Sequence, residues 1–468
     1  MSLSGWSRRH VIAALAASGA LGACRGMPVA ASRPPWDEAE AIARGIQPAS
    51  IPRRSFPVEP AGPRNRDIRP AILKALEAAV AGGGGRVVVP PGRWLCEGPI
   101  HLESRCALHV SKGAHLAFGG DASAYLPVVF TRWEGTEAYN YSPMIYARGV
   151  EDVAVTGEGT LDGQGAAHFL PWRERQKPDQ NRLRQMGADG VPPEQRVFGA
   201  GHFLRPQFVQ FVDCERVSVE GVTLVDSPFW CLHPVYCRHV TVRNVRIVSR
   251  HINSDGVDPD SSEDVLIEGC EFDTGDDGVA IKAGRDADGW RVGRPTRRVV
   301  VRDCRFTGQR GGGMAIGSEM SGGVEDVFVE RYAMNAVNHG LYFKANLDRG
   351  GLIRNIFIRD IDIERADTVL IFTNDYHSYR GGNAPTRFED VRVENVRCGQ
   401  AELGISIVGH PNAPIRRVSV ENLRVDRVQS PVDLRHVEAL EFTNVRMNGE
   451  LIAAEETAPG SVDRTLRY

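Results

Sequence analysis

The chain has 468 residues, of which 50 are glycine and 7% are aromatic, and its formal net charge is −3. This length suits several ordinary domains or one large repetitive domain. The near-neutral charge gives no overall basic surface, so we expect no nucleic-acid partner. The high glycine and low aromatic content favour a chain rich in strands and turns over a helical bundle.

Residues 1–31 resemble a twin-arginine export signal. Ser7-Arg8-Arg9-His10-Val11 carries the arginine pair, and the uncharged run that follows, as far as Ala23, is too short to span a bilayer. Leu21-Gly22-Ala23-Cys24 resembles a lipobox, which makes Cys24 a candidate for lipid attachment to a membrane. Ordinary cleavage near Val29-Ala30-Ala31 is the alternative. We expect export, to a periplasmic, secreted or lipid-anchored location at the cell envelope.

Two segments precede the repetitive part of the chain. Residues 32–63 are rich in Pro and Arg, which predicts a linker or an extended arm. The stretch RDIRPAILKALEAAVAGGGG, from Arg66 to Gly85, has apolar residues at helical spacing and ends in a glycine run. It predicts a short N-terminal helix that caps the open end of the following fold. Residues 64–468 are predicted to form a single domain.

One short phrase, apolar-x-apolar-x-x-apolar-x-apolar, recurs from Glu151 onward. After a first copy near Val153, it begins at Val217, Val240, Val265, Val299, Val327, Ile356, Val391, Val418 and Leu440. Its period of two predicts a strand with one buried face, and the Gly or Asn that often follows predicts a bend. Because no helical periodicity intervenes, we predict an all-β fold, a right-handed parallel β-helix. A β-sandwich, which would need hairpin turns, is the structural alternative.

Cysteines recur at fixed places in this phrase. Cys270 and Cys304 each lie five residues after the first apolar position, and Cys214 and Cys237 each lie three residues before it. We expect them to stack as small buried side chains rather than to form disulfides or bind metal. The sequence shows no Cys or His spacing typical of zinc, and we expect no metal and no other cofactor.

Three aspartates gather in the stretch HINSDGVDPDSSEDVLIEGCEFDTGDDGVAIKAG, which begins at His251. Asp255 and Asp277 each start an Asp-Gly-Val sequence, 277 − 255 = 22 residues apart, and Asp276 precedes the second. Matched positions on neighbouring coils lie about 4.8 Å apart. Like charges so close repel and raise at least one pKa, which suits a hydrolase that pairs a protonated acid with ionised carboxylates. A calcium site, or aspartates that only form turns, is the alternative.

The residues around these aspartates resemble a known family. Asn253-Ser254-Asp255 and Gly275-Asp276-Asp277 are similar to the N-[TS]-D and G-D-D motifs of the polygalacturonase family of glycoside hydrolases, family 28. The stretches GGGGRVVVPPGRW, RWEGTEAYNYSPMIYA, GTLDGQG, SPFWCLHP and IGSEMSGGV extend the resemblance from about residue 60 to the C-terminal coils. The resemblance implies a right-handed β-helix that hydrolyses a polysaccharide with inversion. It implies that Asp276 is the general acid, and that Asp255 and Asp277 hold the attacking water and act as base. An acid and a base separated by water usually lie roughly 6.5–9.5 Å apart.

The sequence departs from the family pattern at two positions. The family usually has Gly-His-Gly on the next coil, where Gly311 fills the histidine position here. It also has Arg-x-Lys one coil further, which grips the uronate carboxylate; here Lys344 remains and Tyr342 replaces the arginine. A tyrosine cannot supply the charged fork that fits a carboxylate. His339 is either a replacement for the missing histidine or an ordinary turn residue.

The other candidates for substrate binding lie outside the aspartate cluster. Asn253 belongs to the N-[TS]-D motif, and Trp230 and His233 are expected to line a sugar subsite, with core packing of Trp230 as the alternative. Tyr376 lies where the family often has an active-site tyrosine. Lys282 faces the same cleft or only pairs with Asp258, and Arg349 is a candidate for a displaced positive charge. The complete candidate set is Asp255, Asp276, Asp277, Asn253, Lys344, Tyr342, Lys282, His233, Trp230, Tyr376, Arg349 and His339.

We therefore expect an exported β-helix glycosidase. It would cleave a pectic or related acidic polysaccharide with inversion of the anomeric configuration and without a metal. A rhamnogalacturonan hydrolase, or an exo-enzyme similar to a rhamnosidase, is the first rival because Tyr342 replaces the family arginine. A calcium-dependent polysaccharide lyase and a non-catalytic sugar-binding solenoid are further rivals. Endo or exo action and the oligomeric state stay open at this point.

Overall fold

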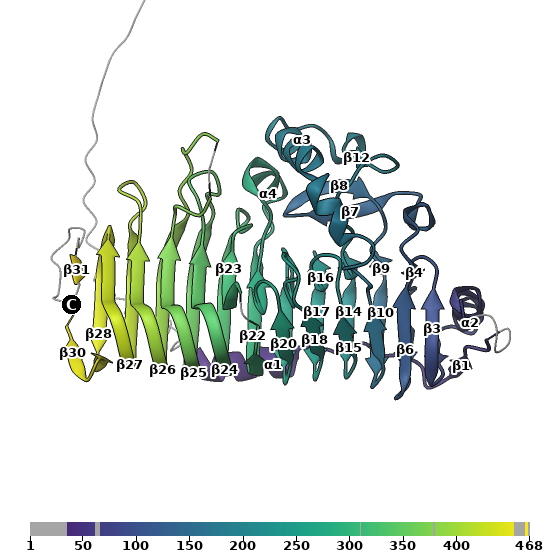
Figure 1. The fold of residues 1–468 in the computed structure, drawn as a ribbon, viewed down its shortest axis with the longest axis horizontal. Helices are drawn as coiled ribbons and strands as arrows, with labels where there is room; N and C mark the ends of the chain where they lie inside the picture. The colour runs from purple at the N-terminus through teal and green to yellow at the C-terminus, as the bar shows by residue number, and fades with distance from the viewer. Residues whose placement is uncertain (1–34, 61–65, 309, 378–379, 454–463, 467–468) are drawn as a thin grey trace, which may run out of the picture. The chain divides into compact units, whose positions relative to one another are not determined.

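The computed structural model describes residues 35–60, 66–308, 310–377, 380–453 and 464–466 (Figure 1). The predicted export signal and the lipid-attachment candidate Cys24 lie outside these residues. From Pro35 the described chain forms one unit. Within it, the longest apolar helical stretches fall short of what crossing a membrane requires.

The segment predicted as a linker or an extended arm holds some regular structure in its described part, residues 35–60. It contains helix α1 (Pro35–Gly45) and strand β1 (Ser55–Pro57). Ala39 of the helix and Ile46, the residue after it, are buried against Phe328 and its neighbours on the outer face of the coils. β1 then pairs in parallel with β2 and extends the sheet. Pro and Arg dominate the composition of this segment and obscure the short amphipathic helix within it.

The predicted capping helix is confirmed as α2 (Arg69–Ala81). It buries Ile72, Ala75, Leu76 and Ala79 in the main core, beside the first strands. In Figure 1 it lies at the end of the stack, next to β1 and β3. The glycine run that follows ends the helix and leads into β2 (Gly85–Val89).

Parallel strands stack coil upon coil to form the right-handed β-helix predicted from the repeated phrase (Figure 1). The first coils contain β3 (Gly92–Cys96), β4 (Ile100–His101), β5 (Cys106–Val110), β6 (Ala114–Phe118), β9 (Ile145–Arg148), β10 (Glu151–Gly157) and β11 (Thr160–Asp162). The central coils contain β13 (Val209–Val212), β14 (Glu215–Glu220), β15 (Thr223–Val225), β16 (Leu232–Val235), β17 (Arg238–Arg243), β18 (Arg246–Ser249), β19 (Glu263–Glu268), β20 (Glu271–Thr274), β21 (Val279–Ile281), β22 (Thr296–Phe306) and β23 (Gly312–Gly317).

In the later coils the strand and its bend merge into long curved strands. These are β24 (Val324–Lys344), β25 (Leu352–Thr373), β26 (Arg387–Val408) and β27 (Ile415–Arg435). Four short strands follow, namely β28 (Val437–Thr443), β29 (Val445–Met447), β30 (Glu450–Ile452) and β31 (Arg464–Leu466). The parallel stack thus runs as far as β28 and β29, and β30 and β31 pair with it in antiparallel.

The register of the coils follows the phrase. Val217, Val240, Val265 and Val299 are paired in turn along the stack, and each is buried. The predicted bends have left-handed backbone, for example at Asn244 with φ 52°. All eight cysteines in the described ranges are free and buried, which confirms that the cysteines in the phrase pack as small side chains.

A structure built from two insertions, one before β9 and one after β11, rises above the stack on one side (Figure 1). It contains β7 (Val129–Trp133), β8 (Thr136–Asn140) and β12 (Val197–Phe198), which form a small separate sheet. It also contains α3 (Lys177–Ala188) and the short 3-10 helices η2 (Leu170–Glu174) and η3 (Pro193–Gln195). We call these elements the insertion wall. Outside it are a 3-10 turn, η1 (Ala122–Tyr125), and helix α4 (Asp286–Val292), which contacts α3.

Candidate active site

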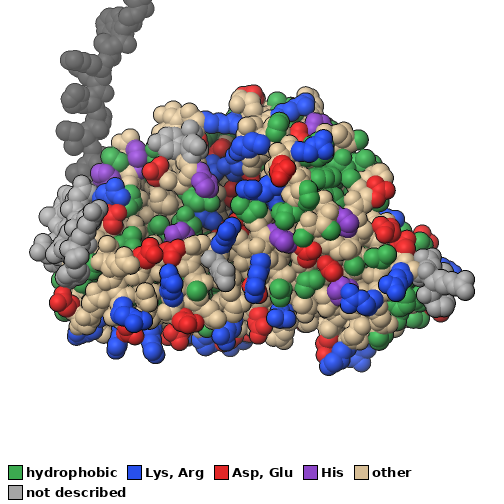
Figure 2. Space-filling model, in the orientation of Figure 1, with side chains coloured by type: hydrophobic (Ala, Val, Ile, Leu, Met, Phe, Trp, Pro, Cys, Tyr) green, Lys and Arg blue, Asp and Glu red, His purple; other side chains and the backbone are tan. Residues whose placement is uncertain are grey.

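A cavity of about 600 Å³ lies between the central coils and the insertion wall. The coils supply its floor, from Asn253 to Lys344. The insertion wall supplies one side, with Glu134, Arg173 and Arg184 among the lining residues. The opposite side is formed by the loop after β25, with Tyr376 and His377. Figure 2 shows Lys and Arg side chains gathered on the upper part of this face.

Strand register brings the three aspartates together on the floor. Val257 pairs with Val279, so Asp255 and Asp277, two residues earlier on each coil, occupy matched positions. One carboxylate oxygen from each of Asp255, Asp276 and Asp277 lies within 4.8 Å of the other two. This convergence was predicted from the repeated Asp-Gly-Val sequence. The oxygens lie closer than the roughly 6.5–9.5 Å that we expected for an acid and a base separated by water.

Two buried lysines balance two of these carboxylates. Lys282 Nζ lies 3.2 Å from Asp255 Oδ2, and Lys344 Nζ lies 2.5 Å from Asp277 Oδ2. Both lysines follow the aspartate strands at matched positions, because Ile281 pairs with Ile316 and Gly317 pairs with Lys344. Each lysine therefore reaches back to an aspartate of an earlier coil.

Asp276 has no lysine of its own. Its Oδ2 accepts a hydrogen bond from the Asn253 backbone N–H at 3.3 Å, and its Oδ1 accepts one from the Asp277 N–H at 3.1 Å. Burial, and then the neighbouring Asp255 and Asp277 carboxylates, raise the pKa of Asp276 from 3.8 to about 7. A carboxyl with this pKa can hold a proton near neutrality and donate it during a reaction.

Asp255 keeps one free acceptor. Its Oδ1 is buried and accepts no hydrogen bond within the described ranges, whereas its Oδ2 contacts Lys282. Burial raises the pKa of Asp255, although Lys282 opposes this effect. Behind it, burial and the Asp255 carboxylate raise the pKa of Asp258 well above the ordinary range. Lys282 thus pairs with Asp258 at 3.2 Å and also lines the cleft, so both alternatives for this residue hold.

A buried arginine fixes the Asn253 loop. Arg205 donates to the Asn253 Oδ1 at 2.8 Å and to the carbonyls of Pro228 and Ile252. It makes no ion pair in the part of the chain that the structure describes, and burial lowers its pKa to about 10. Asn253 lies at the cavity with φ 60°. Arg205 therefore stabilises the turn whose backbone N–H donates to Asp276.

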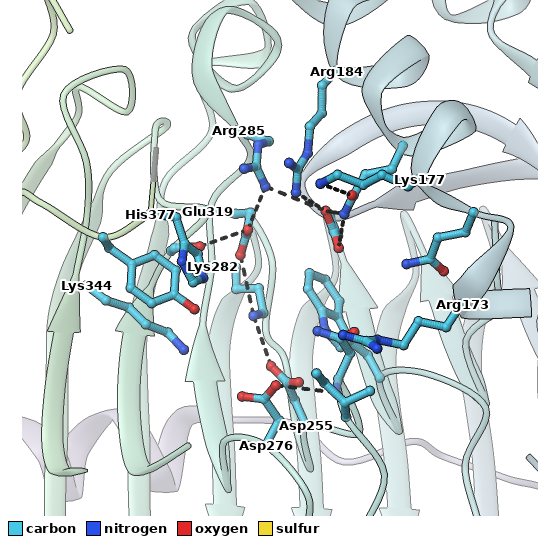
Figure 3. Close-up of a pocket in the computed structure, with 18 residues that line it drawn as sticks. Arg173, Lys177, Arg184, Asp255, Asp276, Lys282, Arg285, Glu319, Lys344 and His377 are labelled. Atoms are coloured by element: carbon cyan, nitrogen blue, oxygen red, sulfur yellow. Dashed lines mark hydrogen bonds and ion pairs between the residues drawn. The ribbon is translucent and has the colours of Figure 1, made fainter. Parts of the chain in front are cut away.

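A chain of ion pairs connects the floor to the insertion wall (Figure 3). Glu319 Oε2 lies 3.5 Å from Lys282, and Glu319 Oε1 accepts from Arg285 at 2.9 Å. Arg285 lies 3.7 Å from Glu134, which contacts Arg184 at 2.5 Å. Lys282 and then Arg285 hold the pKa of Glu319 far below its usual range despite burial. The carboxylate of Glu319 is therefore ionised and links the two sides.

Several predicted site residues lie elsewhere than expected. His233 is fully buried and bonds to Gln210 and Asp260, so it does not line the cavity. The reason is that β7 of the insertion wall covers this part of β16: Thr131 donates to Gln210. Arg349 is also buried, bound to the Ser318 carbonyl and to Asp286, and does not supply the displaced charge at the cavity.

The aromatic candidates divide between the cavity and its surroundings. Trp230 lines the cavity with 3% exposure, and Lys282 Nζ lies 4.0 Å from its ring centre. Tyr376 also lines the cavity, and the centre of its ring lies 5.4 Å from Lys344 Nζ. Tyr342 packs beside Tyr376, just behind the lining, and the His339 ring lies tilted against Tyr342 with 4.2 Å between the ring centres. Neither Tyr342 nor His339 is a lining residue.

The glycine at the family histidine position has a structural reason. Gly311 has φ 75°, and a Cβ there would lie 2.5 Å from the Asp277 backbone nitrogen. No side chain fits at this position without moving the loop that carries the aspartates. The loss of the histidine is therefore tied to the local backbone.

Sequence reasoning missed most of the charged residues that line the cavity above its floor. Glu134, Arg173, Lys177, Arg184, Arg285 and Glu319 line the cavity but were not predicted. Glu134 lies in the stretch RWEGTEAYNYSPMIYA and Glu319 lies in IGSEMSGGV, both of which resemble the family. These stretches held a signal for two of the six. The other four lie in η2, in α3 and before α4, outside the repeated phrase.

The aspartate cluster has the donor types of a cation site. The ammonium groups of Lys282 and Lys344 already contact Asp255 and Asp277, and a metal would compete with them for the same oxygens. The cluster therefore fits acid–base chemistry better than metal binding.

Comparison with known proteins places this geometry in a family. Residues 197–443 match the model of "Glycosyl hydrolases family 28". The chain belongs to glycoside hydrolase family 28. It is 29% identical over 356 residues to a probable polygalacturonase of Vitis vinifera, covering 73% of this chain and 67% of that protein. As a family 28 member it is a glycoside hydrolase.

Solved structures of polygalacturonases are also similar to this chain. An exopolygalacturonase from Thermotoga maritima is 37% identical with a TM-score of 0.87, covering 92% of this chain and 99% of that one. A polygalacturonase from Erwinia carotovora has the same fold at 23% identity, with a TM-score of 0.64 over 85% of this chain and 98% of that one.

Proposed function

We propose that this family 28 hydrolase acts on pectic galacturonan and releases galacturonate from the chain end. The observation that carries the proposal is a carboxyl cluster at the base of a cavity that is walled on two sides. Its lining has six Lys and Arg residues against four Asp and Glu residues, which favours an anionic sugar over a neutral one.

The walls support attack at a chain end. The insertion wall stands on one side of the cavity, and the loop after β25 reaches across to it, where Arg380 Nη1 donates to Gln185 Oε1 at 3.2 Å. A polymer that threads through an active site needs a groove open at both ends, whereas a bridged cavity suits a terminal sugar. The similarity to an exopolygalacturonase points the same way.

In this proposal the three aspartates divide the chemistry. Asp276, with its raised pKa, protonates the leaving glycosidic oxygen. Asp255, with its free Oδ1, and Asp277 hold the attacking water and accept its proton. Lys282 and Lys344 hold these two carboxylates in place through their ion pairs. The predicted export signal, if used, would bring the enzyme to polymeric pectin outside the cytoplasm.

A timed digestion tests the proposal. Polygalacturonate and rhamnogalacturonan are incubated separately with the protein, and the products are resolved by chromatography from the first minute. We expect galacturonate alone from polygalacturonate at every time. Early mixed oligomers would overturn the exo assignment, and release from rhamnogalacturonan alone would overturn the substrate. An unsaturated product that absorbs in the ultraviolet would indicate a lyase.

A further inference from the structure

We propose that Arg173 binds the carboxylate of the substrate's terminal galacturonate, and so replaces the arginine that Tyr342 displaces. This inference rests on the proposed function, because it presumes an anionic sugar in the cavity. It assigns carboxylate recognition to the insertion wall rather than to the coils.

The other cations of the cavity are already engaged. Lys282 contacts Asp255, Asp258 and Glu319, and Lys344 contacts Asp277. Two further arginines are paired as well, since Arg184 on α3 binds Glu134 and Arg285, just before α4, binds Glu319. Lys177 donates to Gln180 at 2.9 Å. A substrate carboxylate would have to compete with a protein group for each of these cations.

Arg173 is different, because it is exposed at the cavity and makes no ion pair with any residue in the described ranges. Figure 3 shows its side chain extending from the wall over the floor, toward the region of Asp255 and opposite Lys344. The guanidinium therefore reaches into the cavity beside the reacting groups, and it donates no hydrogen bond to any residue that the structure describes.

The turn that carries Arg173 is held in place. Arg173 lies in η2, and the adjacent Trp172 packs edge-on against Phe169, Tyr141 and Phe203 at ring distances of 5.0–5.5 Å. Little conformational freedom of the backbone remains to be lost when the substrate binds, which favours recognition by this side chain.

A second positive charge lies near Arg173. Arg205 lies near enough for the two positive charges to repel, and it too has no ion pair in the described part of the chain. Arg205 is buried behind the lining and its donors are used by protein acceptors, so its charge adds to the positive field at this corner while Arg173 is the guanidinium that an anion can reach. A guanidinium also matches a carboxylate with two parallel hydrogen bonds, which a lysine cannot provide.

The test compares two variants on two substrates. Arg173→Gln removes the proposed contact, and Arg182→Gln removes the same charge from an exposed position on α3, where Arg182 lies over the Phe198 ring and away from the cavity lining. The value of kcat/KM is measured on an aryl α-galacturonide and on the matching aryl α-galactoside. The inhibition constant of free galacturonate is measured as a second readout.

We expect Arg173→Gln to lower kcat/KM on the galacturonide about 10- to 100-fold, the effect of losing a hydrogen-bonded charge contact. The galactoside rate should change less than about threefold, galacturonate should inhibit more weakly, and Arg182→Gln should resemble the wild type. Arg173→Lys, which keeps the charge but not the fork, should fall between.

Two outcomes would separate the failures. A wild type that prefers the galacturonide, with an Arg173→Gln variant that keeps both this preference and the inhibition by galacturonate, overturns the role of Arg173 alone. A wild type that prefers the galactoside overturns the proposed function and this inference together.

Discussion

The floor and the insertion wall of the cavity both carry many charges, but they acquire them in different ways. On the floor, strand register stacks Asp255 on Asp277 and sets each lysine at a fixed distance from its aspartate. The wall is built from insertions outside the repeat, and Arg173 and Lys177 on it stay exposed to solvent. The comparison suggests that the repeat supplies the chemistry and that the insertions select the substrate.

The largest effect is expected at the floor. Asp276→Asn should lower kcat on galacturonan about 10²- to 10⁴-fold, because an amide cannot protonate the leaving oxygen. Steady-state kinetics of the purified variant measures this. A variant that keeps a tenth of the wild-type rate would show that another group is the acid. An aryl substrate with a good leaving group should be affected less.

Lys344→Met should destabilise the floor as well as inactivate it. The change leaves the fully buried Asp277 without its positive partner, and breaking a buried pair typically costs about 3–5 kcal/mol. Denaturant unfolding measures this loss. Lys112→Met is the control, because the Lys112–Glu158 pair is largely exposed and surface pairs contribute at most about 1 kcal/mol. Equal losses in the two variants would contradict the importance of the buried pair.

On the wall, Glu134→Gln should change binding more than chemistry. Glu134 contacts Arg184 at 2.5 Å and lies 3.7 Å from Arg285, so its neutralisation loosens the wall without touching the aspartates. We expect KM for galacturonan to change about three- to tenfold while kcat stays within about twofold. If kcat falls tenfold at unchanged KM, the insertion wall takes part in the chemistry. That result would contradict the division of roles between the floor and the wall.

The pH dependence should be smaller and should come from the floor. Asp276 must be protonated to act as acid, so kcat should fall as the pH rises through about 7. The raised pKa also means that the folded protein binds a proton which the unfolded chain loses above about 4. Stability should therefore decline as the pH rises from about 4 to 7. Asp276→Asn should remove this part of the slope in pH-dependent unfolding. An unchanged slope would contradict the raised pKa.

The floor was predictable from the sequence because its geometry is periodic. The phrase that repeats from Val217 fixes which residues stack, and the two Asp-Gly-Val sequences then place Asp255 beside Asp277. Most of the wall was not predictable, since Arg173 in η2 and Arg184 in α3 come from irregular segments far from the aspartates in the chain. His233 was misjudged because the insertion buries it, and α1 was missed because it is short and lies among prolines and arginines.

Access to the carboxylates decides between the two possible stereochemical outcomes. The oxygens of the cluster lie within 4.8 Å of one another, which is closer than typical inverting pairs, so distance alone does not select single displacement. Asp277 accepts from the Gly312 N–H and from Lys344 through its two oxygens and is fully buried. Asp255 keeps its Oδ1 without a hydrogen bond from the described residues, so this oxygen can accept one from a water that lies between it and the sugar.

Proton NMR of the first minutes of hydrolysis, before mutarotation, tests this account most directly. The account predicts that the newly released galacturonate appears first as the β-anomer from an α-linked substrate, because water attacks from the side of Asp255 and Asp277 while Asp276 protonates the leaving group. Initial appearance of the α-anomer, or a glycosyl group trapped on any of the three aspartates, would contradict it.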